Sequence, residues 1–332
     1  MSANCTSAPD AVPSDGGVAG IGVLLSFIVT AAIALVISAS LVFQATRKKS
    51  SQKPSVLRRK LLNSYSDQQI LTGIGIQSVG LAKTTTMVPY HFFLIWMLSL
   101  LSMAVHNATL LALARDFRRD WVLRWMRQFL MLVNLALSSV YGIYIFRSVQ
   151  DNLSDRTFPI ACAWDPETPD VPAQGDRALS YVGTILVIVG NVVIFLLASW
   201  YLHYRAQRFY AIFQVVGLLL MTGFAVGATV RVAYLADAFA SGTPITLSDS
   251  GEREWSFGQL LSVGMLLLPL VSVVEILRGE IKCAPPVAHD YDEDKGQLLG
   301  EEQELRSNPR FQGTADFQPN PFWGSQTNLF RK

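Results

Sequence analysis

Long runs of apolar residues dominate the first 277 positions of the chain. A helix needs about 20 apolar residues to cross the hydrocarbon core of a bilayer. Residues 18–43 form such a run without a single charged side chain. Further runs of similar length are 91–113, 122–146, 179–203, 210–236 and 257–277. The pattern predicts an all-α membrane protein built as a bundle of transmembrane helices.

A further segment, 67–86, is ambiguous because its apolar stretch is short, rich in glycine and interrupted by Gln77. The loop charges favour counting it as a span. With seven spans, one side carries 16 basic residues, and the other carries 5 basic and 12 acidic residues. Since cytoplasmic loops gather Lys and Arg, we predict a seven-helix bundle with the N-terminus outside and the C-terminus in the cytosol. The expected parts are an outer N-terminus (1–17), a transmembrane domain (18–277) and a mostly disordered cytosolic tail (278–332).

The composition agrees with a multi-pass protein of the plasma membrane or an endomembrane. Apolar residues make up 51% of the chain and charged residues 16%, against about 25% charged in soluble domains. The net charge is only +2, so no nucleic-acid partner is expected. Three cysteines and four histidines are scattered along the chain, so neither a metal site nor a cofactor is predicted.

Several residues outside the spans are candidates for covalent modification. Cys5 and Cys162 lie on the predicted outer side, where an oxidising compartment allows a disulfide; two free thiols are the alternative. Asn4 and Asn152 occupy N-glycosylation sequons on the same side. Cys283 follows the last span on the cytosolic side, where it is either palmitoylated or unmodified.

Two segments on the cytosolic side indicate partners beyond the lipid bilayer itself. Positions 47–60 are rich in basic residues, and apolar residues recur among them at helical spacing. This pattern is typical of a short helix that lies on anionic lipid. The alternative is that these charges only determine the topology. The acidic tail contains a dileucine pattern at 294–299 and Asn-Pro-Phe at 320–322, which are similar to trafficking-adaptor signals and also common by chance.

Polar side chains inside the spans mark candidate functional sites, because they are costly in the membrane. One group gathers toward the cytosolic ends of four spans, and we name it the inner polar cluster: Asp67, Gln68, Gln69, His106, Asn107, Arg124, Arg127 and Glu275. We expect at least one close carboxylate–guanidinium contact in it. The cluster is either a polar chamber or switch, or a set of contacts that seat the helix ends. Near the outer face, Arg231 is expected to turn outward and bond Gln259.

Four short motifs lie within these spans: Ser-Asp-Gln-Gln-Ile-Leu-Thr-Gly at 66–73, Tyr90-His91 with Trp96, His-Asn-Ala-Thr-Leu at 106–110, and Trp-Ser-Phe-Gly-Gln at 255–259 with Pro269 and Glu275. Together they resemble a group of polytopic integral membrane proteins from filamentous fungi. The resemblance covers about residues 20–280. It implies a fungal origin, and it supplies no activity or site residues.

Three classes of function fit this architecture. A receptor, sensor or scaffold matches seven spans with an outer N-terminus, which is the plan of G-protein-coupled receptors and an analogy only. A retinal protein is excluded because 257–277 contains no lysine. A membrane-embedded enzyme or accessory protein of a fungal secondary-metabolite pathway is the alternative, although the chain has no phosphate loop or nucleophile elbow. A transporter is the third, and the odd span count disfavours it.

Overall fold

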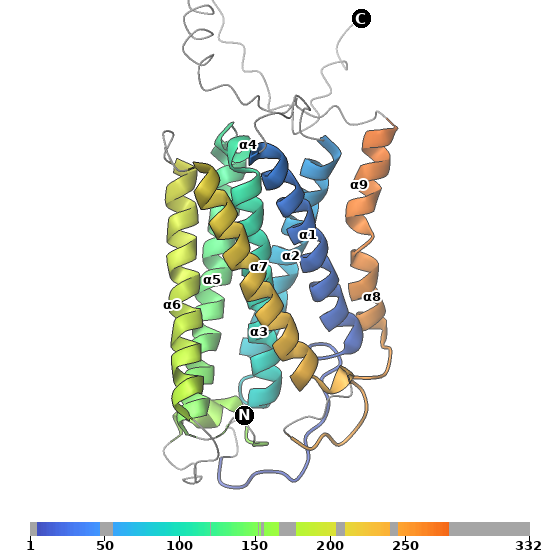
Figure 1. Ribbon diagram of the computed structural model, residues 1–332. Coiled ribbons are helices and arrows are strands. Elements are labelled where there is room, and N and C mark those ends of the chain that lie inside the picture. The colour runs from blue at the N-terminus through green and yellow to red at the C-terminus, as the bar shows by residue number, and fades with distance from the viewer. Residues whose placement is uncertain are drawn as a thin grey trace, which may run out of the picture.

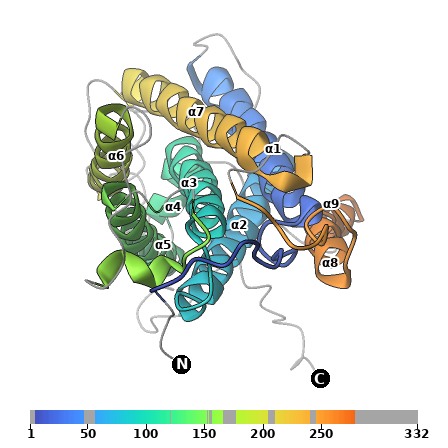
Figure 2. The same ribbon diagram turned by 90° about the horizontal axis from the view of Figure 1, so that it is seen from below.

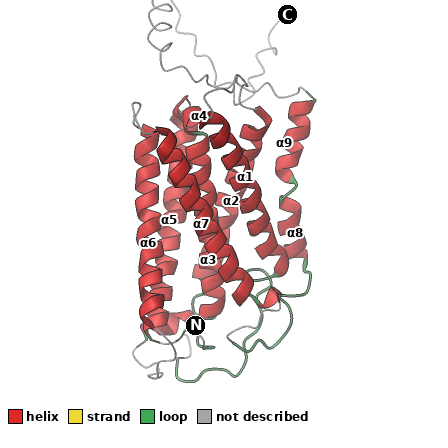
Figure 3. Cartoon of the chain, viewed as in Figure 1, coloured by secondary structure: helices red, strands yellow, loops and turns green. Residues whose placement is uncertain are grey.

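A computed structural model of the chain describes residues 5–46, 56–119, 121–151, 153, 156–165, 177–203, 210–239 and 245–278 (Figure 1). The described residues are helical or irregular (Figure 3). One isolated parallel bridge joins Val12 to Leu247. The long helices are α1 (Ile21–Thr46), α2 (Val56–Ala82), α3 (Pro89–Ala112), α5 (Trp121–Gln150), α6 (Arg177–His203) and α7 (Tyr210–Leu235). The short ones are α4 (Ala114–Arg119), η1 (Ile160–Trp164), η2 (Asp237–Phe239), α8 (Phe257–Met265) and α9 (Leu268–Leu277).

Five of the described helices are long and apolar enough to cross a membrane, namely α1, α3, α5, α6 and α7. The prediction of an all-helical, multi-pass membrane protein is confirmed at this level. Helix α2 has 27 residues, but its first turns are rich in basic side chains, which lowers its mean hydropathy. Helices α8 and α9 have 9 and 10 residues and are each too short to cross.

Helix α3 lies at the centre of the bundle, surrounded by α1, α2, α5, α6 and α7 (Figure 2). Its candidate membrane span is buried along the whole length. The peripheral helices α6 and α7 instead turn large apolar side chains such as Leu186 and Leu219 away from the protein. A helix that is apolar on all faces suits either position, since a core and a lipid phase both exclude polar groups.

Helix α2 begins well before residue 67, where the sequence places the start of the second span. Residues 56–60 belong to its first turns, so this part of the basic segment 47–60 continues into α2 and is not a separate short helix; 47–55 lie outside the described residues. No glycine or proline interrupts the helix between 56 and 67. Arg58 donates to Ser40 (3.3 Å) and Gln44 (2.8 Å) on α1.

The predicted last span, 257–277, is broken into α8 and α9 (Figure 1). Pro269 explains the break. It has no backbone N–H, and its ring clashes with the carbonyl four residues earlier, which belongs to Met265, the last residue of α8. The two short helices still follow each other along the bundle, with α8 against α1 and α9 against α2.

Three segments, which we name the cap, cover the end of the bundle at which α1 begins: residues 5–19, 156–165 and 245–256. A disulfide joins Cys5 to Cys162, with their Cα atoms 5.5 Å apart. The bond predicted between these two cysteines is therefore present. Its sulfur atoms are buried with Leu153 and Phe158 in a small apolar cluster separate from the main core.

Backbone pairing holds the first and last segments of the cap together. Val12 N–H donates to Thr246 (3.1 Å), and Ser248 N–H donates to Val12 (2.8 Å). Beside this pairing, the Ser14 hydroxyl, with backbone N–H groups of Gly251 and Ser14, holds the pKa of the Asp249 carboxyl below its ordinary value. This contact stabilises the cap at pH values above the ordinary pKa of Asp, and it is lost as the pH falls through the lowered pKa.

Candidate functional site

The inner polar cluster contains the carboxylate–guanidinium contact expected from the sequence. Asp67 on α2 forms an ion pair with Arg127 on α5. The Arg127 guanidinium also donates to the Asn63 carbonyl (3.3 Å) and lies 4.7 Å from the ring centroid of Phe117. Arg127 is buried, whereas the side chain of Asp67 is 48% exposed. A second ion pair, Arg59 with Asp116, joins α2 to α4 at the same end of the bundle.

His106 lies deeper in the bundle and connects α3 to α2. Its Nδ1 atom lies 2.9 Å from the Ser66 hydroxyl, and its Nε2 atom lies 3.4 Å from the Ser102 hydroxyl. Ser102 in turn donates to the backbone carbonyl of Gln69 (2.9 Å). His106 is thus held by two hydroxyl groups, and no described ion pair includes it.

Other members of the inner polar cluster are near these groups in sequence without joining the ion pair. Arg124 is half-buried, and it takes part in no ion pair among the described residues. Asn107 is fully buried, and its side-chain amide has no hydrogen-bond partner within the described part of the chain. Gln68 and Gln69 border a small cavity between α1, α2 and α8. Glu275 lies in α9, and its side chain is not among those that the structure describes.

Polar contacts between α2 and α5 continue toward the cap. The Gln77 side chain donates to Asn134 Oδ1 on α5 (2.6 Å), and the Tyr141 hydroxyl donates to the Gln77 carbonyl (2.8 Å). Buried amide contacts of this kind contribute of order 1 kcal/mol to helix association in a membrane. They explain why a segment as polar as α2 packs against α5.

The predicted pairing of Arg231 with Gln259 is absent. The Gln259 side chain receives the Gly22 N–H at 3.2 Å and donates to the Glu254 carbonyl at 2.9 Å, so it fastens α8 to the start of α1. Arg231 instead lines a cavity between α3, α5, α6 and α7. Their positions along the helices put Arg231 and Gln259 near the same end of the bundle. The rotation of each helix about its own axis, however, turns the two side chains toward different neighbours.

Sequence reasoning missed a buried carboxylate in the cap. Glu252 has no exposed surface, and its two carboxylate oxygens accept hydrogen bonds from the Tyr90 hydroxyl (3.0 Å) and His91 Nε2 (2.6 Å) at the start of α3. The Tyr90 hydroxyl also receives the Asp237 N–H at 2.9 Å. The only signal in the sequence was the Tyr-His pair itself, which gives no indication of its partner.

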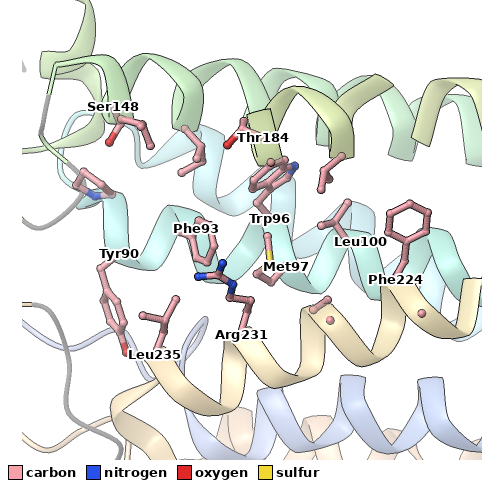
Figure 4. Close-up of a pocket in the computed structure, with 18 residues that line it drawn as sticks. Tyr90, Phe93, Trp96, Met97, Leu100, Ser148, Thr184, Phe224, Arg231 and Leu235 are labelled. Atoms are coloured by element: carbon pink, nitrogen blue, oxygen red, sulfur yellow. The ribbon is translucent and has the colours of Figure 1, made fainter. Parts of the chain in front are cut away.

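A cavity of about 460 Å³ lies between α3, α5, α6 and α7, on the half of the bundle nearer the cap (Figure 4). This volume is within the range of small-molecule sites. Aromatic and aliphatic side chains of α3, including Phe93, Trp96 and Met97, form much of its wall. Its polar lining comes from Tyr90, Ser148, Thr184 and Arg231.

Two glycines of α7 contribute to the volume of this cavity. A Cβ atom added at Gly223 or Gly227 would have no heavy atom within 4 Å. Glycines at this spacing often mark close helix packing in membranes, but these two face open space. Gly183 on α6 borders the same cavity and is equally unobstructed.

The remaining predicted sites are not part of this geometry. Asn4, Asn152, Cys283 and the tail patterns at 294–299 and 320–322 lie outside the described residues. Within the described residues, no three His, Cys, Asp or Glu side chains gather as a metal site would require. Comparisons with known protein families, curated proteins and solved structures found no match to this chain.

Proposed function

We propose that the chain is a seven-span membrane protein, with the cap outside and the C-terminus in the cytosol, which acts as a receptor or sensor for a small, largely apolar molecule. The observation that carries this proposal is the cavity between α3, α5, α6 and α7. It is a concave, mostly apolar site with a few polar groups, which is the usual character of a small-molecule site. The cap, which contains the Cys5–Cys162 disulfide, is adjacent to this cavity.

Two further helical paths along the bundle support the proposed count of seven spans. Helix α2, with 27 residues, is about 40 Å long at 1.5 Å per residue. It runs beside α1, α3 and α5, as a crossing helix would. Helices α8 and α9 together occupy one further path along the bundle (Figure 1). The excess of basic residues on the side opposite the cap favours that side as cytosolic.

A topology assay tests the span count and the orientation together. A reporter active only in the cytosol is expected to be active when fused after Lys332 and silent when fused before Met1, because an odd number of spans puts the two ends on opposite sides. The same reporter inserted at 166–176 should be silent. Activity at both ends, or the reverse pattern, would contradict the proposed topology.

Helix α3 gives the cavity a route to the cytosolic side. Tyr90, Trp96 and Leu100 border the cavity, and Ser102 and His106 on the same helix contact α2 next to the Asp67–Arg127 pair. A ligand that shifts α3 would therefore act directly on the contacts between α2, α4 and α5. This connection favours a sensor over a protein that only stores its ligand.

Photolabelling combined with hydrogen exchange tests this function in the full chain, reconstituted in phosphatidylcholine nanodiscs. A diazirine-bearing hexadecanol is expected to label α3 at 89–100, and saturating probe should alter exchange in α4. Gly223→Leu should reduce the labelling several-fold because its side chain fills open cavity space. Gly264→Leu on α8, also unobstructed but outside the cavity, is the matched control.

Two outcomes would contradict the proposal. Labelling that is equal on all lipid-facing helices and insensitive to Gly223→Leu would mean that the cavity takes no ligand. Labelling of the cavity with unchanged exchange in α4 would exclude the sensor function and leave a binding protein.

A further inference from the structure

We propose that the ligand of this cavity is a single-chain amphiphile with an anionic head, which Arg231 binds while the chain lies along α3 toward the middle of the membrane. The inference rests on the proposed function, because it names the ligand class of the same cavity. Three features of the cavity carry it: a cation in no described ion pair, an unpartnered hydroxyl, and an apolar lining that extends from them away from the cap.

Arg231 is the only charged residue among those that line the cavity. No ion pair among the described residues includes it. Figure 4 shows its side chain rising from α7 toward Phe93 on α3, across the cavity. Arg231 is exposed, and a guanidinium ion binds carboxylate or phosphate oxygens through two parallel N–H groups, so an anion that enters the cavity can pair with it. The cavity therefore has the charge that an anionic head requires.

Hydroxyl groups on the opposite wall supply further hydrogen-bond donors. Ser148 is 1% exposed, and its Oγ atom has no hydrogen-bond partner within the described residues. It borders the cavity together with Thr184, which is also buried (Figure 4). A buried hydroxyl without a partner is unfavourable, so the Ser148 hydroxyl is available to donate to an oxygen placed in the cavity. An oxygen of the anionic head would accept this hydrogen bond.

Apolar side chains of the lining also continue away from the cap. Trp96, Met97 and Leu100 follow one another along α3, and Phe224 faces them from α7 (Figure 4). Arg231 is two turns of α7 closer to the cap than Phe224. Helix α6 packs on α3 and α5, whereas α7 packs on α3 and α1, so these two helices flank the cavity from different sides. The head of an amphiphile would thus lie near the membrane surface and its chain near the midplane.

Head-group selectivity tests the ligand class directly. The full chain in phosphatidylcholine nanodiscs is titrated with palmitate, hexadecyl phosphate, hexadecanol and hexadecyltrimethylammonium. We expect the two anions to bind about tenfold or more tightly than the alcohol, since hydrogen bonds to a charged group are worth more than neutral ones. The cationic probe should bind weakest. The two anionic arms distinguish a carboxylate from a phosphate monoester, and inorganic phosphate alone should not compete because it has no chain.

Substitutions of Arg231 separate the anion site from the cavity. Arg231→Met is expected to weaken palmitate binding about tenfold or more and hexadecanol binding by a much smaller factor, and Arg231→Lys should retain most of the selectivity. Ser148→Ala should reduce palmitate binding by a smaller factor. Arg253→Met removes an arginine of the cap that is paired with Asp237 and does not border the cavity, so it is the matched control.

The possible failures are distinguishable. Equal affinity for palmitate and hexadecanol, both reduced by Gly223→Leu, would overturn the anionic head and leave the cavity as a ligand site. Selectivity for anions that persists in Arg231→Met would likewise overturn the role of Arg231. Binding of all probes that is insensitive to Gly223→Leu would contradict the proposed function itself.

Discussion

Asp67→Ala is expected to lower the free energy of unfolding by about 3–5 kcal/mol, the usual cost of leaving a buried charge without its partner. The partner is Arg127, which is 7% exposed and pairs with Asp67 across the α2–α5 contact. After the substitution, the contacts of the guanidinium among the described residues are the Asn63 carbonyl and the ring of Phe117. Thermal or denaturant unfolding of the detergent-solubilised protein measures the loss.

The two members of this pair should not be equivalent. Arg127→Met leaves Asp67, whose side chain is 48% exposed and can be hydrated, so it should cost less than Asp67→Ala. Lys83→Met breaks the more exposed pair with Asp15 and should change stability by about 1 kcal/mol or less. A larger loss for Arg127→Met than for Asp67→Ala would refute the proposed asymmetry.

The sequence was sufficient for most of the fold because the membrane imposes a simple rule. Uninterrupted apolar runs of the length needed to cross a bilayer become helices, and α1, α3, α5, α6 and α7 follow that rule. The rule fails where polar residues are satisfied by other helices. The first turns of α2, before residue 67, contain Arg58 and Arg59, which find partners on α1 and α4, and hydropathy contains no information about such partners.

The candidate sites were predictable only in part, for a related reason. Helical rise gives the depth of a side chain, so Asp67 and Arg127 could be expected to meet. The rotation of a helix about its axis depends on packing, and it turned Arg231 into the cavity and away from Gln259. Ser148 is conspicuous only once its burial is known, because serines are common along membrane helices.

Tyr90 joins the cap to the proposed ligand site. Its ring borders the cavity, and its hydroxyl donates to Glu252 while accepting the Asp237 N–H. The Glu252 backbone carbonyl also accepts the Ile21 N–H (3.0 Å) at the start of α1. Glu252 therefore connects the first turn of α1 to the first turn of α3, and a ligand that moves Tyr90 would disturb both helix ends.

His91→Phe is expected to lower the free energy of unfolding by about 3–5 kcal/mol, because it leaves the Glu252 carboxylate buried with the Tyr90 hydroxyl as its remaining side-chain donor. A carboxylate only accepts hydrogen bonds, so the contact at 2.6 Å requires His91 Nε2 to donate. Phenylalanine fills a similar volume and cannot donate. The expected loss therefore comes from the uncompensated carboxylate, with little contribution from a change in packing.

A double-mutant cycle separates these two causes. Glu252→Gln removes the charge and keeps the size of the side chain, so His91→Phe should cost less in the Glu252→Gln background than in the native chain. Denaturant unfolding at neutral pH of all four proteins, each with the Cys5–Cys162 disulfide intact, gives the coupling energy. An equal cost of His91→Phe in both backgrounds would mean that His91 acts through packing alone and that the buried carboxylate does not depend on it.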